Sequence, residues 1–296
     1  LAYLEHARRI SAADDQAHAQ SLWNAADCFD KAQIRDQAIT VFKQLITTRR
    51  DDSMHNAATR RLAMAYMAAR QYNAAAEHFN DLIATHPRSP HALASLTPLA
   101  RCYQKLEQYD NARRTLLSVV ENHPVITPDS EMYRDAMVEL GNLYLQRAQV
   151  DPTCYPKAIE TLDAALQRYD DGEQVTGLCF QLAEALRQSV RRIDQMILAT
   201  RDPRKLKVLE AERQDRLQRA QRRYDQVVEN IDKLPQAAQT QLDRLRLRSA
   251  SFYRAHAAFD QRDFEQAIEL YDQAARRWAD EPACLIALVQ VVNARC

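Results

Sequence analysis

Apolar side chains between residues 56 and 124 recur at spacings of three and four residues, the period of one face of an α-helix. The same pattern is written twice, and each residue of the second copy lies 37 positions after its counterpart in the first. The recurring pairs are Ala63 and Ala100, Tyr66 and Tyr103, Ala75 and Ala112, and Pro87 and Pro124. A fixed period of this length predicts a solenoid built from repeated helical units.

Each unit is predicted to hold two helices, A and B, joined by a short turn. Helix A of the first copy carries Ala63 and Tyr66 on its apolar face, and helix B carries Ala75 and Phe79. The two alanines allow the helix axes to approach closely, and the aromatic rings fill the space beside them. Pro87 follows helix B, where a residue that cannot continue a helix is expected.

These positions resemble the tetratricopeptide repeat (TPR). Counted from Asn56 as position 1, the matching residues are Ala63 at position 8, Tyr66 at 11, Ala75 at 20, Phe79 at 24, Leu82 at 27 and Pro87 at 32. The resemblance implies an all-α fold, a right-handed α-solenoid of about six TPR-like helical hairpins. The long period and the phrase from Leu82 to Pro90 are similar to the repeats of bacterial cell-envelope assembly and coordinator proteins.

The pattern divides the chain into three stretches. Residues 1–172 are predicted to form a regular TPR array, with units that start near residues 19, 56, 93 and 134. Residues 173–234 carry two long apolar stripes, which predict that the fifth unit is elongated into a coiled-coil-like hairpin. Residues 235–296 hold a C-terminal TPR unit and a truncated next helix. Because the chain opens and ends inside helical patterns, we expect it to be a piece of a longer protein.

Composition and charge narrow the choice of partners. The chain has only 3 glycines among 296 residues, and 40 basic residues balance 40 acidic ones. This balance predicts no global attraction to nucleic acid or to a membrane surface, and no apolar run is long enough to predict a membrane span. Cys28 and Cys102 fall at the same position of helix A, so both are expected to pack inside the array.

No catalytic motif is present in the sequence. It contains neither a glycine-rich phosphate loop nor G-x-S-x-G or H-E-x-x-H, and its eight histidines lack the spacing of metal ligands. We therefore expect a protein that is not an enzyme and that has no cofactor and no bound metal.

The resemblance also implies where a partner binds. In TPR arrays the A helices line a concave groove, and their positions 5, 9 and 12 point into it. The predicted groove residues are Trp23, Asp27, Arg60, Met64, Met67, Arg101, Gln104 and Asn142. Aromatic, methionine and arginine side chains are enriched at interface cores, so we expect a non-catalytic scaffold that binds a peptide or helix of another protein. Trp23 and Met64 are equally compatible with simply packing against neighbouring side chains.

A second surface is predicted on the elongated hairpin. Between Arg201 and Arg223 nine basic residues accompany four acidic ones. The candidate residues are Arg213, Arg216, Arg219, Arg222 and Arg223. They would suit nucleic acid or another anionic surface, although a solvated helix face has the same pattern. No aromatic residue interleaves them to stack on bases, so nucleic acid is not the expected partner.

The amino-acid sequence leaves three further points open. The turn of the fourth unit carries an insertion, Gln149–Pro156, which is either a binding edge or a tolerated loop. The chain could serve as the regulatory or sensor region of a larger enzyme or signalling protein, and exposed repeat ends could drive self-association. The compartment could be the bacterial cell envelope or the cytoplasm.

Overall fold

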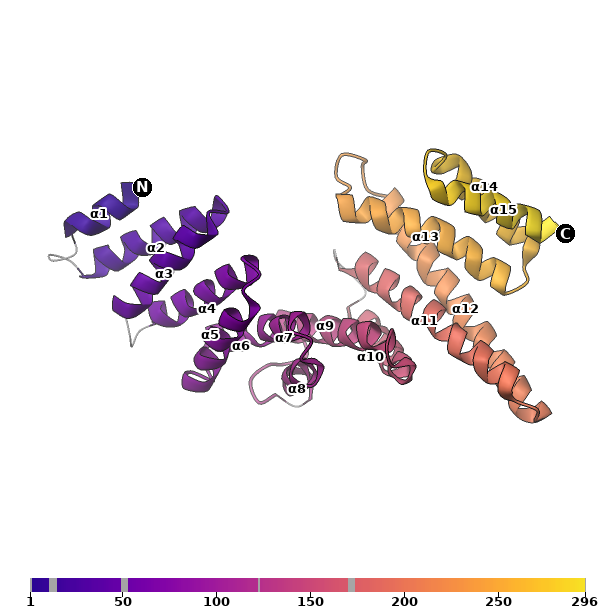
Figure 1. Ribbon diagram of the computed structural model, residues 1–296, viewed down its shortest axis with the longest axis horizontal. Coiled ribbons are helices and arrows are strands. Elements are labelled where there is room, and N and C mark those ends of the chain that lie inside the picture. Colours follow the sequence, from indigo (N-terminus) through magenta and orange to yellow (C-terminus); the bar gives the residue numbers. More distant parts are fainter. Residues whose placement is uncertain (1, 11–14, 49–52, 122, 170–173, 296) are drawn as a thin grey trace. The chain divides into compact units, whose positions relative to one another are not determined.

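The computed structural model describes residues 2–10, 15–48, 53–121, 123–169 and 174–295, and the regular secondary structure of these segments is helical (Figure 1). They contain no β-strand. The predicted all-α class is therefore confirmed. The chain divides into two compact units, Leu1–Leu143 and Tyr144–Cys296, here called unit 1 and unit 2. The domain boundaries expected near residues 172 and 234 stay predictions.

Unit 1 is a succession of helices, most of which pack against their neighbours along the chain. Its helices are α1 (Ala2–Ile10), α2 (Asp15–Lys31), α3 (Arg35–Thr48), α4 (Ser53–Ala68), α5 (Tyr72–Thr85), the short α6 (Pro90–Leu93), α7 (Leu96–Lys105), α8 (Tyr109–Val120) and α9 (Glu131–Ala148), which runs past the boundary into unit 2. The pairs α2–α3, α4–α5 and α7–α8 are the predicted hairpins of helices A and B.

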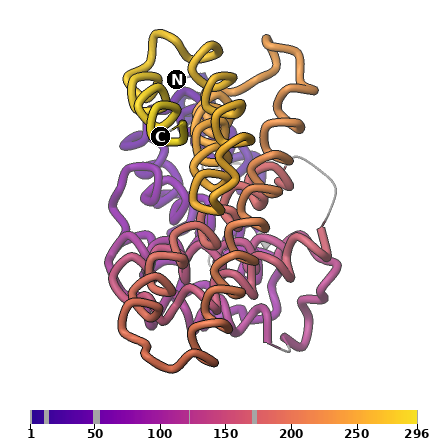
Figure 2. Tube along the Cα trace, turned by 90° about the vertical axis from the view of Figure 1, so that its right-hand side faces the viewer, coloured from indigo at the N-terminus to yellow at the C-terminus, as the bar shows by residue number. Residues whose placement is uncertain are grey.

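Unit 2 repeats this plan with one enlarged hairpin. Its elements are the 3₁₀ turn η1 (Pro152–Cys154), α10 (Tyr155–Arg168), α11 (Val175–Ala199), α12 (Pro203–Asp232), α13 (Gln241–Asp260), α14 (Phe264–Arg277) and α15 (Pro282–Arg295). The helices α11 and α12 are 25 and 30 residues long and lie antiparallel, side by side (Figure 2). The predicted elongated hairpin is confirmed.

The core of each hairpin follows one rule along helix B. Each helix B carries a triplet of buried side chains: a small residue, a large residue four positions later, and an apolar residue three positions after that. All members of these triplets are at most 2% exposed. The six triplets are Ala38–Phe42–Leu45, Ala75–Phe79–Leu82, Ala112–Leu116–Val119, Ala158–Leu162–Ala165, Ala220–Tyr224–Val227 and Ala267–Tyr271–Ala274. The spacing places all three side chains on one helix face. This is the apolar stripe that the sequence period predicted.

The turn from helix A to helix B repeats as well, and it has a feature that the sequence did not reveal. Gln33, Arg70, Glu107 and Arg262 each occupy the left-handed region, with φ between 59° and 64°. At Arg70 the turn is closed by hydrogen bonds from Arg70 N to Met67 O and from Gln71 N to Tyr66 O. This is the usual end of a helix, but its left-handed position normally holds glycine.

Glycine at this position is expected to stabilise the protein. An L side chain in the left-handed region costs about 1–2 kcal/mol, and part of that is offset by the greater freedom of glycine in the unfolded chain. We expect Arg70→Gly to raise the free energy of unfolding by about 0.5–1 kcal/mol, measured by urea titration. The control Glu77→Gly, at an exposed position inside α5, should lower it by about 1 kcal/mol. Destabilisation by both variants would contradict this account of the turn.

A polar network joins the three helices at the base of the elongated hairpin. Arg187 of α11 donates to Glu184 at 3.0 Å and to the hydroxyl of Tyr224 of α12 at 3.2 Å. Its guanidinium also lies 4.3 Å from the ring centroid of Tyr253 of α13. Tyr224 is buried, and its hydroxyl donates to Glu184. Burial, with Glu184 beside it, raises the pKa of Tyr224. The network therefore holds neutral tyrosine and charged arginine in one partly buried cluster.

The neighbouring His256 predicts how stability changes with pH. Its Nδ1 is hydrogen-bonded to the hydroxyl of Tyr271, and burial, with Arg187 nearby, lowers its pKa. Below about pH 6.5 the unfolded chain therefore binds a proton at His256 more readily than the folded chain does. Stability contributed by neutral His256 is present above that pH and is lost as the pH falls.

We expect the melting temperature to be lower at pH 5.5 than at pH 7.5, and we expect this difference to be smaller in His256→Asn. Thermal unfolding followed by circular dichroism at both pH values measures the difference. His86→Asn, which removes a histidine outside this cluster, is the control. An equal fall in the parent protein and in His256→Asn would show that His256 does not contribute.

One packing prediction is wrong. Cys102 is buried, and burial raises the pKa of its thiol to about 11. Cys28, at the same repeat position, is exposed. The described part of α1 is hydrogen-bonded to α2 at His18 and Ser21, about two turns before Cys28. No described helix of a preceding repeat therefore covers the Cys28 side chain.

Candidate partner-binding surfaces

The predicted groove residues all lie on the A helices of unit 1. Arg101 is exposed and the other seven are half-buried. We call these eight residues the helix-A face: Trp23 and Asp27 on α2, Arg60, Met64 and Met67 on α4, Arg101 and Gln104 on α7, and Asn142 on α9. Their binding role stays a prediction, and contacts within unit 1 separate all of them except Asn142 into three groups.

The apolar members are anchored in the array. The Trp23 ring packs edge-on against Phe42 of α3, with centroids 6.0 Å apart and an interplanar angle of 76°. Met64 and Met67 pack against the buried core of unit 1. Packing against neighbouring side chains, one of the two interpretations of Trp23 and Met64, is therefore what the structure shows. Each side chain still keeps part of its surface accessible.

Two charged members join neighbouring A helices. Asp27 of α2 accepts from Arg61 of α4 at 2.5 Å, and Arg61 also pairs with Asp30 at 3.1 Å. Arg101 of α7 pairs with Glu139 of α9 at 3.0 Å. Asp27 and Arg101 thus already have partners within unit 1, so they are poorer candidates for binding another protein than the sequence indicated.

Two polar members carry buried atoms that lack a hydrogen-bond partner. These are Arg60 Nε on α4 and Gln104 Nε2 on α7, for which the described residues supply no acceptor. Burial, with Arg61 nearby, lowers the pKa of Arg60. A buried donor without an acceptor costs about 1–3 kcal/mol. An acceptor from a bound chain would recover this energy, which distinguishes Arg60 and Gln104 from the rest of the face.

The predicted basic surface of the hairpin is largely neutralised by acidic groups of unit 2. Arg213 pairs with Asp194 at 2.7 Å, and Arg219 and Arg223 both pair with Asp163 of α10, at 3.2 and 3.5 Å. Arg216 pairs with Glu212, whereas Arg222 is exposed. These ion pairs leave little free positive charge at the five arginines, so the structure gives the anionic-ligand alternative no support at this place.

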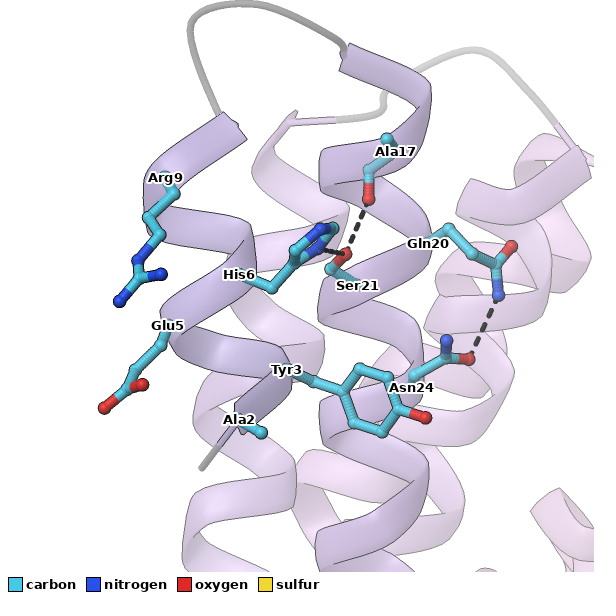
Figure 3. Close-up of a pocket in the computed structure, with 9 residues that line it drawn as sticks. All are labelled: Ala2, Tyr3, Glu5, His6, Arg9, Ala17, Gln20, Ser21 and Asn24. Atoms are coloured by element: carbon cyan, nitrogen blue, oxygen red, sulfur yellow. Dashed lines mark hydrogen bonds between the residues drawn. The ribbon is translucent and has the colours of Figure 1, made fainter.

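A hollow of about 650 Å³ lies along α1 and α2, at residues that the sequence analysis did not single out (Figure 3). His6 Nδ1 is 2.9 Å from Ser21 Oγ, and the Tyr3 ring extends toward Asn24. Glu5 and Arg9 also line the hollow, but their side chains point away from α2 (Figure 3). No residue of the helix-A face takes part, so this hollow is a separate feature of unit 1.

The exposed apolar face of α15 bears on the predicted self-association. On this helix, which the sequence predicted as the truncated next helix, Leu285, Leu288, Val289 and Val292 are 45–69% exposed. Cys284, Ala287 and Val291 instead form the buried side. Association through this face stays a prediction.

Searches for other kinds of site gave two results, both restricted to the described residues. No group of three or more histidine, cysteine, aspartate or glutamate side chains is placed to hold a metal ion. No described helix combines the length and apolar character that crossing a membrane requires.

Comparison with known families assigns the fold. Three models described as tetratricopeptide repeat match residues 20–51, 66–134 and 233–290, which together cover more than half of the chain. The chain therefore belongs to the tetratricopeptide repeat family, a class of helical-repeat scaffolds for protein–protein interaction. The resemblance found in the sequence is confirmed.

Two solved structures are similar to the chain. The structure from the functional characterisation of Pseudomonas aeruginosa pilF has a TM-score of 0.56 at 13% identity, over 93% of this chain and 99% of that one. A tetratricopeptide repeat protein from Parabacteroides merdae has a TM-score of 0.45 at 14% identity, over 93% and 98%. At 13% identity the likeness to the pilF structure shows the fold alone. The search of curated proteins gave no match.

Proposed function

We propose that the chain is a non-catalytic scaffold that holds a peptide or helical segment of another protein along the helix-A face of unit 1. The observation that carries the proposal is the pair of buried donors without acceptors, Arg60 Nε and Gln104 Nε2. They lie on the A helices of two successive repeats. A bound segment would supply acceptors, such as backbone carbonyl oxygens, once the two side chains shift to expose these donors.

The remaining members of the face suit the same role. Met64 and Met67 adapt their shape to different apolar side chains, and Trp23 offers part of a ring held rigid by Phe42. Because the helices are already stacked, the receptor would lose little conformational freedom on binding. The ion pairs of Asp27 and Arg101 would then hold the spacing of the A helices rather than contact the partner.

The double variant Arg60→Met/Gln104→Met is expected to lose partner binding without loss of stability. The apolar replacements remove the unpartnered donors, so the free energy of unfolding should stay equal or rise. Partner affinity should fall by about tenfold or more. The partner is first captured from a lysate of the source cells and identified by mass spectrometry. Its Kd for the parent chain and for the variant is then measured by isothermal titration calorimetry.

The matched control is Gln37→Met/Arg114→Met, which makes the same substitutions at exposed positions on the B helices α3 and α8. It should retain full affinity. Equal affinity of the parent chain and of Arg60→Met/Gln104→Met would refute binding along the helix-A face.

A further inference from the structure

Two hollows on the elongated hairpin share one residue. The first, of about 240 Å³, lies where Tyr155 meets Ser189 and Ile193 of α11. The second, of about 500 Å³, lies near the hairpin tip beside Val208 and Leu209 of α12. Met196 of α11 lines both. The two hollows therefore adjoin at Met196, and together we call them the hairpin groove.

The floor of the hairpin groove is apolar and partly open. Ile193 and Leu209 are buried, but Met196 is 45% exposed and Val208 is 66% exposed. Both exposed side chains stand on long, regular helices. Apolar side chains that line a hollow on a rigid element are typical of a site that receives apolar side chains of a partner.

The rim of the hairpin groove is positively charged. Arg192, Arg204 and Lys205 line it and are exposed, and none of them forms an ion pair with another described residue. The acidic Glu212 is already paired with Arg216. Unpaired positive charge thus lines this groove, whereas four of the five arginines that the sequence singled out, all but Arg222, are paired with carboxylates.

The sequence insertion forms one end of the hairpin groove. Pro152 and Thr153 of η1, together with Pro156, line the first hollow. Thr153 is held by hydrogen bonds to Asp151, at 3.0 Å from its backbone N and 2.6 Å from its hydroxyl. The inserted turn is thus an ordered wall of the groove, which favours the binding-edge interpretation of Gln149–Pro156 over that of a tolerated loop.

We propose that the hairpin groove binds an acidic amphipathic segment of a partner protein. Its apolar side chains would cover Met196 and Val208, and its carboxylates would meet Arg192, Arg204 and Lys205. Charge complementarity supports this occupant. A membrane surface fits less well, because the most protruding apolar side chain of the tip, Leu198 at 87% exposure, lines neither hollow. The groove lies in unit 2, so the proposal is independent of the helix-A face.

Peptide selection tests the proposal directly. A phage-displayed library of random short peptides is selected against the immobilised chain, and enriched peptides are titrated by fluorescence anisotropy. We expect peptides that combine acidic residues with spaced apolar ones, and an affinity that falls as salt is raised. Val208→Glu should weaken their binding by about tenfold or more. Leu198→Glu, which introduces the same charge at an exposed residue of the same hairpin outside both hollows, should leave it unaltered, and circular dichroism confirms that both variants fold.

Enrichment of no peptide, or of peptides that bind Val208→Glu as well as the parent chain, would overturn the proposal. If the peptides fail and the chain instead binds phosphatidylserine vesicles through Leu198, the hairpin tip is a membrane contact. The variant Arg60→Met/Gln104→Met should bind the selected peptides normally. The two surfaces can therefore succeed or fail separately.

Discussion

Replacing Phe79 with alanine is expected to lower the free energy of unfolding by about 3–5 kcal/mol. The Phe79 ring is fully buried in α5, at the centre of the core of unit 1. Its removal leaves a cavity between two hairpins whose helices cannot close up without shifting the repeats on either side. Urea unfolding monitored by circular dichroism measures the loss.

The control for Phe79 is Phe264→Ala. Phe264 opens α14, is 41% exposed and makes an edge contact with Phe259. Its removal should cost about 1 kcal/mol or less, because exposed rings contribute little burial. Equal losses for Phe79→Ala and Phe264→Ala would show that the helix-B triplets do not form the core.

Removing the carboxylate of Glu184 is expected to have a comparable effect on unit 2. Glu184→Leu leaves the largely buried guanidinium of Arg187 without its ionic partner and leaves the Tyr224 hydroxyl without an acceptor. Loss of one member of a buried ion pair costs about 3 kcal/mol or more. Thermal and urea unfolding should show this decrease in the free energy of unfolding.

Two further variants distinguish the loss of the Glu184–Arg187 ion pair from the loss of any charged side chain. Glu184→Leu/Arg187→Met replaces both charges with apolar groups and should recover part of the stability lost in Glu184→Leu. Asp232→Asn breaks a surface ion pair between Asp232 and Arg277, in which the two side chains are 42% and 40% exposed. This change should lower the free energy of unfolding by about 1 kcal/mol or less. A double variant less stable than Glu184→Leu would contradict the buried-pair explanation.

The sequence predicted best what depends on burial along one helix. The triplet Ala75–Phe79–Leu82 has its counterparts in every hairpin, because each repeat must bury the same stripe against its neighbours. The two apolar stripes of residues 173–234 likewise predicted α11 and α12. These features follow from spacing alone, so they needed no knowledge of the tertiary structure.

The sequence predicted least well what depends on contacts between distant segments. The basic run of the hairpin gave no sign that Asp163 of α10 pairs with Arg219 and Arg223. The left-handed turn at Arg70 lacks the glycine from which such a turn is usually predicted. Cys28 seemed equivalent to Cys102 by position, but burial depends on the neighbouring helix and not on the repeat position.

A photo-reactive amino acid, p-benzoylphenylalanine, placed at position 64 most directly tests partner binding along the helix-A face. Met64 is half-buried on α4 beside Arg60, whereas Glu77 is exposed on α5 and serves as the control position. Irradiation in a lysate of the source cells, followed by mass spectrometry, measures what each position contacts. Binding along the helix-A face predicts a crosslinked protein at position 64 that is absent at position 77 and that disappears when Arg60→Met/Gln104→Met is added. The same crosslinks at both positions, or at position 77 alone, would contradict it.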